Sequence, residues 1–197
     1  YKRQFEKRLF MRKFKVVMIT SYFDRNGVTS QVMNYATNLD KDRFQVFIAA
    51  GEPYDIGYEK MCQENNIELC KLPQKQKNAY AYYRTIYSYL KKVKADIVHV
   101  HGSSALIAVE LLIAMLAGVP VRVSHSHNTI CSHPLLHQVL KPILKVVSNY
   151  HLACGELAGK WMYGDRAFQV IPNAFDTKTF VSVSYTHLRA HETRSNL

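Results

Sequence analysis

The chain has 197 residues, of which 48% are hydrophobic and 21% charged, with 8 glycines and 6 prolines. This composition is that of a folded globular domain large enough to bury a core, and it excludes disordered, collagen-like and low-complexity proteins. The sequence contains no charge-free apolar run of about 18 residues, so it predicts no membrane-spanning helix. It also lacks the pattern of a signal peptide.

The net charge of +11 is concentrated near the start of the sequence. Residues 1–15 contain seven basic residues and one acid, and they account for six of the positive charges. One more falls on residues 183–197, which leaves +4 for the residues between. The basic start could bind an anionic membrane surface or nucleic acid, but a solvated tail explains it as well. We therefore predict no nucleic-acid partner.

Strand and helix patterns alternate along the middle of the chain. Short apolar runs predict strands over 15–21, 44–50, 67–72, 96–101, 119–124, 151–154 and 168–171. Helical spacing predicts helices over 28–39, 58–65, 79–93, 105–116, 136–148 (interrupted by Pro142) and 156–163. Repeated strand–helix–strand units predict an α/β fold, a doubly wound and mostly parallel Rossmann-like sheet.

These patterns divide the chain into three parts. Residues 1–13 are expected to form a basic extension and residues 14–180 the Rossmann-like domain. Residues 181–197 are expected to be a disordered or artefactual tail, because residues 183–193 have no periodicity and resemble a translated sequencing adapter. In a doubly wound sheet, ligands bind beyond the carboxyl ends of the strands, so we expect the site in loops 22–27, 102–104 and 126–133.

The first of these loops ends in Asn26-Gly27, directly before a predicted helix. Backbone N–H groups of Val28, Thr29 and Ser30 would there face a ligand, as at an anion site. The G-x-G-x-x-G and P-loop fingerprints are absent, which argues against a nicotinamide-dependent dehydrogenase or a P-loop nucleotidase. A single glycine also suits an ordinary strand–helix turn.

Histidines mark the other two loops. His99 and His101 lie two apart on one predicted strand and so share a face, and His125 and His127 repeat the arrangement on the next strand. Histidine can donate protons, bind phosphate or ligate a metal. No acidic ligand accompanies these residues and the four cysteines form no C-x-x-C pair, so we predict no metal and reduced cysteines. At least one histidine is expected to hydrogen-bond in an active site, and His99 is expected to be structural.

Five segments in order resemble the N-terminal half of family 4 glycosyltransferases, which have the GT-B fold. They are 26–35 (NGVTSQVMNY), 96–101 (DIVHVH), 122–128 (RVSHSHN), 154–161 (CGELAGKW) and 170–176 (VIPNAFD). The resemblance covers about residues 14–180 and is greatest to the bacterial group that builds capsular and exopolysaccharides.

The resemblance implies roles for particular residues. Asn26, Gly27 and Val28 would lie against the donor phosphates and the reacting sugar, and His127 would act as the catalytic residue beside the transferred sugar. The other residues expected to bind substrate are His101, Gly102, His125, Asn128 and Asn173. Such loops usually have two glycines; Asn26 replaces the first, and asparagine enters left-handed geometry readily.

The resemblance also implies partners. This half would hold a saccharide or lipid-linked acceptor, and a missing C-terminal domain would hold the nucleotide sugar, a UDP-sugar, as co-substrate. Transfer would retain the anomeric configuration without a metal or other cofactor, in the cytoplasm at the inner face of the plasma membrane, with a peripheral membrane contact. The chain alone would then be inactive. The alternatives are a stand-alone sugar- or nucleotide-binding module without catalysis, and a histidine-based metallohydrolase.

Overall fold

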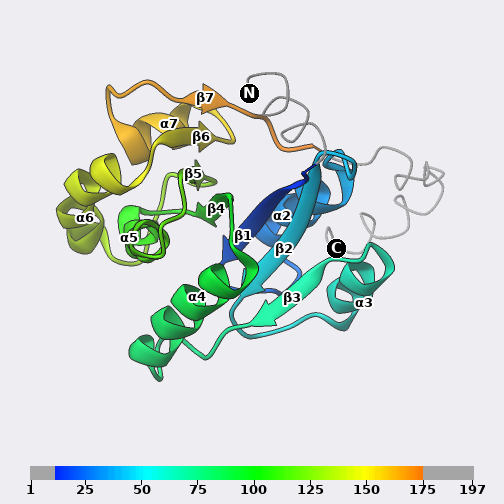
Figure 1. Ribbon diagram of the computed structural model, residues 1–197. Helices are drawn as coiled ribbons and strands as arrows, with labels where there is room; N and C mark the ends of the chain where they lie inside the picture. The colour runs from blue at the N-terminus through cyan, green and yellow to red at the C-terminus, as the bar shows by residue number, and fades with distance from the viewer. Residues whose placement is uncertain (1–11, 175–197) are drawn as a thin grey trace, which may run out of the picture.

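The computed structural model describes residues 12–174; the predicted tail at 181–197 and most of the basic extension at 1–13 lie outside the described residues. Seven parallel strands form one sheet, with helices on both of its faces (Figure 1). The predicted doubly wound, Rossmann-like α/β fold is therefore confirmed. The strands are β1 (Phe14–Thr20), β2 (Phe44–Ala50), β3 (Glu68–Lys71), β4 (Ile97–Gly102), β5 (Val121–Ser126), β6 (Tyr150–Ala153) and β7 (Gln169–Val170).

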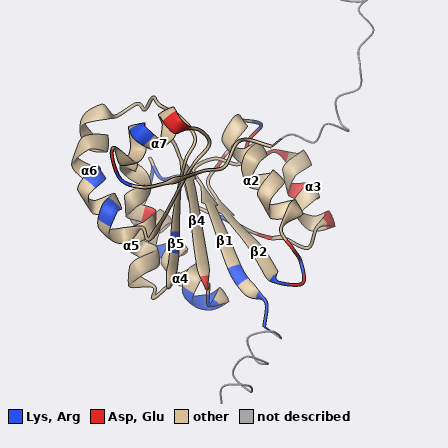
Figure 2. Ribbon diagram, turned by 90° about the horizontal axis from the view of Figure 1, so that it is seen from above, with Lys and Arg blue, Asp and Glu red and all other residues tan. Residues whose placement is uncertain are grey.

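Every predicted helix is present among the described residues. The helices are α2 (Gly27–Asn38), α3 (Ile56–Glu64), α4 (Ala79–Val93), a short 3-10 turn η1 (Ala105–Ile107), α5 (Ala108–Leu116), α6 (Pro134–Val147) and α7 (Glu156–Tyr163). Helices α2 and α3 cover one face of the sheet, and α4, α5, α6 and α7 cover the other (Figure 2). None of the helices within residues 12–174 combines the length and apolarity needed to cross a membrane.

Alternate residues of the central strands belong to two separate apolar layers, one on each face of the sheet. In β1, Val17 and Ile19 pack towards α4 and α5, whereas Val16 and Met18 pack towards α2. Because both faces are buried, these strands carry continuous apolar runs rather than an alternation of polar and apolar residues. This explains why the sequence pattern located them.

The strand order reverses between β1 and β4. The order across the sheet is β3-β2-β1-β4-β5-β6-β7, so the chain builds outward from β1 to β3 and then returns to the other side of β1. Connections leave the carboxyl ends of β1 and β4 in opposite directions, and the crevice between them is where doubly wound sheets bind ligands. The fold thus places loops 22–27 and 102–104 on either side of one crevice.

Most predicted boundaries differ from the observed ones by one or two residues, and two predictions were wrong at a proline. Strand β5 begins at Val121 rather than at Val119, since Pro120 has no N–H for the ladder and the Val119 N–H bonds the Ala114 carbonyl of α5. Helix α6 is not interrupted at Pro142 but continues through it. Pro142 is exposed, so the carbonyl that loses its partner one turn earlier can be hydrated.

Gly51, directly after β2, offers a test of the packing at the crevice. A Cβ atom there would lie 2.4 Å from the backbone oxygen of Ser21, so Gly51→Ala must displace the chain after β1. Overpacking of this kind costs about 1–3 kcal/mol of unfolding free energy, measurable by urea denaturation. Gly27→Ala is the matched control, because nothing lies within 4 Å of the Cβ position there. Equal stabilities for the two variants would contradict the packing described.

Candidate active site

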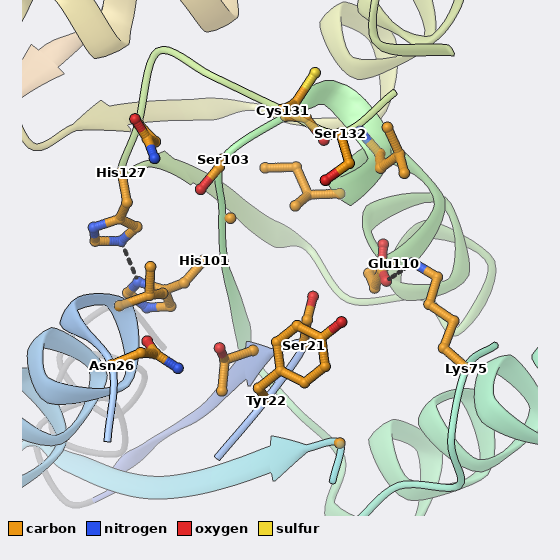
Figure 3. Close-up of a pocket in the computed structure, with 18 of the residues that line it drawn as sticks. Ser21, Tyr22, Asn26, Lys75, His101, Ser103, Glu110, His127, Cys131 and Ser132 are labelled. Atoms are coloured by element: carbon orange, nitrogen blue, oxygen red, sulfur yellow. Dashed lines mark hydrogen bonds and ion pairs between the residues drawn. The ribbon is translucent and has the colours of Figure 1, made fainter. Parts of the chain in front are cut away.

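A cavity of about 870 Å³ opens at the strand-order reversal. It is lined by residues that follow the carboxyl ends of β1, β2, β4 and β5, by the first turn of α2, by the loop before α4 and by Asn173 (Figure 3). Most of the side chains drawn in the cavity carry hydroxyl, amide or imidazole groups. All three loops that the sequence singled out contribute residues to this one cavity.

Asn26 caps helix α2 at the edge of the cavity. Its side-chain oxygen accepts a hydrogen bond from the Thr29 N–H at 2.9 Å, a standard N-cap contact. The backbone of Asn26 is extended, with φ −126° and ψ 167°, so the expectation of a left-handed residue here is wrong. Asparagine suits this position because its side chain caps the helix, and not because of an unusual backbone.

Gly27 and Val28 occupy the first turn of α2 and line the cavity. The Thr29 N–H bonds the Asn26 side chain and the Ser30 N–H bonds the Asn26 carbonyl, so the expectation that these two groups face a ligand is wrong. The N–H groups of Gly27 and Val28 have no partner within the helix, and no acidic side chain occupies this turn. The space beside the Gly27 Cα is open, so a ligand can approach the backbone closely. This end of α2 can therefore bind a polar or anionic ligand group.

Two histidine pairs span β4 and β5 on the face covered by α2. In the parallel register His101 lies beside His125. The His101 Nδ1 is 2.9 Å from the His127 Nε2, and the His99 Nε2 is 3.1 Å from the His125 Nδ1. The Tyr35 ring of α2 covers three of these rings at centroid distances of 5.7–6.2 Å. Of the four, His101 and His127 line the cavity.

Burial keeps these imidazoles uncharged. It lowers the pKa of His127 to about 4, of His99 to about 3 and of His125 to about 2, and it holds the pKa of His101 well below its usual range. Neighbouring histidines lower the pKa of His99, His101 and His125 further. At neutral pH His127 therefore acts as a neutral hydrogen-bonding group and not as a cation.

The surroundings of His101 determine where the protons lie. Its Nε2 is buried without a partner among the described residues. A buried N–H without an acceptor costs more than a buried lone pair, so the His101 proton belongs on Nδ1, where it is donated to the His127 Nε2. His127 must then carry its own proton on Nδ1, and it can donate that proton to a ligand.

His99, His101 and His125 each offer a nitrogen within 4.8 Å of the other two, the arrangement in the described chain that comes nearest to a metal site. A zinc ion would need each nitrogen at about 2.0–2.1 Å, with its other ring nitrogen hydrogen-bonded. The second nitrogen of His101 has such a partner in His127, but the His99–His125 hydrogen bond would have to break. The donor set does not fit a metal without rearrangement, and the absence of a metal stays a prediction.

The other predicted binding residues lie at different depths. Gly102, Asn128 and Asn173 line the cavity, and Asn128 and Asn173 are exposed. A side chain at Gly102 would meet Ile107 at 2.5 Å, so glycine is required there for space. His125 is fully buried and lies outside the cavity lining, where it supports the sheet behind His127 rather than facing a ligand.

Sequence reasoning missed a second group at the opposite end of the cavity. Lys75 and Glu110 form a 2.7 Å ion pair there, and Glu110 is buried. Nearby, the Trp161 Nε1 donates to the Ser103 carbonyl at 3.1 Å and fixes the loop after β4. The one signal in the sequence was Glu110 itself, a single acid within the apolar stretch 105–119.

The fold and cavity define a Rossmann-like domain with a cavity at its strand-order reversal that is lined largely by polar side chains. A sequence profile of Glycosyltransferase Family 4 matches residues 25–179, and the chain belongs to this family. It is 27% identical over 181 residues to EpsF of Bacillus subtilis (strain 168), which is provisionally described as a glycosyltransferase. That match covers 84% of this chain and 46% of EpsF, so the chain spans about half the length of this relative.

Solved structures with the same fold include glycosyltransferases and other enzymes. Anabaena HepE, crystallised with UDP and glucose, matches with a TM-score of 0.68 at 13% identity, over 91% of this chain and 50% of HepE. A Listeria monocytogenes protein provisionally described as a UDP-N-acetylglucosamine 2-epimerase matches with a TM-score of 0.54 at 14% identity, over 77% of this chain and 42% of that protein. Such low identities show the fold alone, so it is the family match and not the fold that assigns this chain to Glycosyltransferase Family 4.

The buried histidines predict that stability falls steeply in acid. Below pH 6.5 the unfolded chain binds protons that the folded chain cannot. For each such histidine, the free energy of unfolding therefore decreases by about 1.4 kcal/mol for every unit by which the pH falls. For His99, His125 and His127 together, moving from pH 8 to 5.5 costs about 4 kcal/mol. Urea denaturation at successive pH values measures this slope.

One variant gives the control for this prediction. His127→Gln should reduce the proton uptake on unfolding by about one. A stability that does not change between pH 8 and 5.5 would show that the histidines are not buried as neutral groups.

Proposed function

We propose that this chain is the acceptor-binding half of a nucleotide-sugar-dependent glycosyltransferase that acts in cell-surface polysaccharide synthesis. The observation that carries the proposal is that His127 and the start of α2 line the same cavity in a family 4 chain. In this proposal the first turn of α2 approaches the donor phosphates, and His127 hydrogen-bonds the transferred sugar through its Nδ1–H.

The charge of the cavity supports an acceptor-side role. Lys75 is the only lysine or arginine among the described residues that line the cavity, and it is already paired with Glu110. A nucleotide diphosphate needs cations or several free N–H groups, and this cavity supplies only the turn of α2. We therefore assign most of the diphosphate binding to a C-terminal domain of the whole protein.

The finer features rest on the family and on individual relatives. HepE was crystallised with UDP and glucose, which supports a UDP-sugar as co-substrate. The hydrogen bond between His99 and His125, which a bound metal would have to displace, supports transfer without a metal cofactor. Retention of the anomeric configuration, a saccharide or lipid-linked acceptor and a site of action at the inner membrane face are parts of the same proposal.

The test begins with the source DNA beyond the codon of Phe180. We expect the frame to encode a second domain, and the longer protein to release UDP from a UDP-sugar when an acceptor is added. The 197-residue chain alone should release no UDP under the same conditions. His127→Ala in the longer protein should lower kcat by about a hundredfold or more, since a positioned polar group commonly contributes that much.

Two results would contradict the proposal. Robust sugar transfer by the 197-residue chain would show that no donor domain is needed. Full activity of a well-folded His127→Ala variant would remove His127 from the reaction. A frame without a second domain would favour the alternative, a sugar- or nucleotide-binding module.

Helix α6 supports the proposed membrane contact. Its outer face exposes a row of large apolar side chains: Leu135, Leu136, Val139, Ile143 and Val146. Lys141 and Lys145 lie on the same helix, and lysines mark α6 in Figure 2. The Lys141 Nζ lies 5.8 Å from the Trp161 ring, away from the apolar row. An exposed apolar helix face is suited to lie on a bilayer surface, and lysines elsewhere on the helix favour an anionic one.

Vesicle binding tests this contact. We expect Val139→Asp combined with Val146→Asp to weaken binding to phosphatidylglycerol-containing vesicles at least tenfold, because each valine is more than half exposed and loses about 1.5 kcal/mol or more of apolar burial. Ile56→Asp on α3 is the control, since Ile56 is even more exposed than the two valines but lies on the opposite face of the sheet. Equal binding by all variants would remove α6 from any membrane contact.

A further inference from the structure

Tyr22 presents an exposed aromatic ring to the cavity. It follows the carboxyl end of β1, and the residue is 44% exposed although it lines the cavity. Figure 3 shows its ring among the lining side chains. Pockets that bind small molecules are typically lined by aromatic side chains with a few placed polar groups, and an exposed ring offers apolar surface that a ligand can cover.

Three hydrogen bonds fix the backbone at this point. The Tyr22 carbonyl accepts from the Thr29 Oγ1 at 3.1 Å. The next residue, Phe23, is fully buried; its N–H donates to the Pro53 carbonyl at 3.1 Å, and its carbonyl accepts from the Asp55 N–H at 2.8 Å. Because Phe23 is anchored in the core, the backbone holds Tyr22 at the cavity.

The hydroxyl end of the ring is fixed as well. The Gln76 Nε2, from the loop between β3 and α4, donates to the Tyr22 hydroxyl oxygen at 3.1 Å. That loop is itself held, since the Asn78 N–H donates to the Gln74 carbonyl at 3.0 Å and the Gln74 side chain bonds Glu52. A ring held at both ends loses little freedom when a ligand binds on it. Because Gln76 is the donor, Tyr22 keeps its own O–H proton for a ligand.

The charges and polar groups of the cavity favour an uncharged sugar over a nucleotide. Two acids, Asp24 and Glu52, also line it, and Lys75 is already paired with Glu110. A nucleobase can stack on an aromatic ring, but the phosphates that a nucleotide carries would face like charge here. A sugar ring has a face of C–H groups that packs on an aromatic ring, and its hydroxyls can bond carboxylates, amides and the Tyr22 hydroxyl.

We infer that Tyr22 is a stacking platform for a sugar ring of the acceptor, whose C–H face lies on the aromatic ring. The Tyr22 O–H, which Gln76 leaves free to donate, bonds a hydroxyl at the edge of that sugar. The inference rests on the proposed function and deepens it, because it names the contact and the class of ligand: an uncharged sugar held through its apolar face. Tyr22 binds and orients the sugar, and the transfer itself remains with His127.

NMR on the 197-residue chain tests the inference. The probes are the methyl glycosides of glucose, galactose and N-acetylglucosamine, with UDP for comparison, and the protein carries ¹³C-labelled tyrosine rings. Loss of one signal in Tyr22→Phe assigns the Tyr22 ring among the 13 tyrosines. We expect at least one glycoside to shift that signal saturably and its C–H protons to give NOEs to the Tyr22 ring, whereas UDP at the same concentration should shift the signal far less.

Three variants separate the ring face from the hydroxyl and from general effects. Tyr22→Leu keeps an apolar side chain but removes the aromatic face, and it should weaken glycoside binding about tenfold or more. Tyr22→Phe keeps the face and loses one hydrogen bond, so it should weaken binding only about threefold. Tyr87→Leu is the matched control and should change nothing, because Tyr87 is 39% exposed on α4 and lies outside the cavity lining.

Any of four results would overturn the inference: no glycoside shifts the Tyr22 signal, UDP shifts it as much as the glycosides do, a folded Tyr22→Leu variant binds as tightly as the unchanged protein, or Tyr22→Phe loses as much affinity as Tyr22→Leu. The comparison of glycosides with UDP uses the unchanged protein, so it decides even if Tyr22→Leu does not fold. UDP release by the longer protein is measured separately. Its absence alongside sugar stacking on Tyr22 would overturn the proposed function and not the platform.

Discussion

The parallel pairing of β4 with β5 is the constraint on which the site depends. Its register places His101 beside His125, and the two-residue period of a strand puts all four histidines on the α2 face. The opposite face of β5 carries Ser124 and Ser126, which bond the Tyr163 hydroxyl and the Ala158 carbonyl of α7 at 3.0 Å and 2.9 Å. A slip of one residue would exchange the two sets, so packing on both faces specifies the register.

The same pairing makes the site costly to build. Four imidazoles are enclosed where burial keeps them neutral, and two of them leave a buried nitrogen without a partner in the described part of the chain. Such groups reduce stability unless they are hydrogen-bonded, and here each pair supplies one bond across the strands. In return, His101 of β4 orients His127 across the strands, and His127 reaches the cavity with a fixed ring. The protein is thus less stable than it would be without the buried imidazoles, but it holds a preorganised hydrogen-bond donor at the cavity.

Much of this could be predicted from the sequence, for identifiable reasons. Buried parallel strands carry apolar runs, so β1, β2 and β4 were located within one or two residues. Ligands of doubly wound sheets bind beyond the carboxyl ends of the strands, and this rule predicted from the sequence that Gly27, Gly102 and His127 belong to one site. The hydrogen bond between His101 and His127 could not be predicted, because it depends on the register between two strands. Glu110 was missed because its partner Lys75 is 35 residues away and a lone acid in an apolar helix gives no sign of its direction. The role of Asn26 was misread because a cap and a left-handed turn favour the same residue type.

The central claim is that His101 holds His127 neutral in a single tautomer at the edge of the cavity. Long-range ¹⁵N–¹H correlation spectra of the histidine rings measure this directly, since the two ring nitrogens of each tautomer have different shifts. The account predicts that, between pH 6 and 8, both rings are neutral and carry their proton on Nδ1, with no titration in that range. Rings that titrate near pH 6.5, or that average between tautomers as exposed imidazoles do, would contradict it.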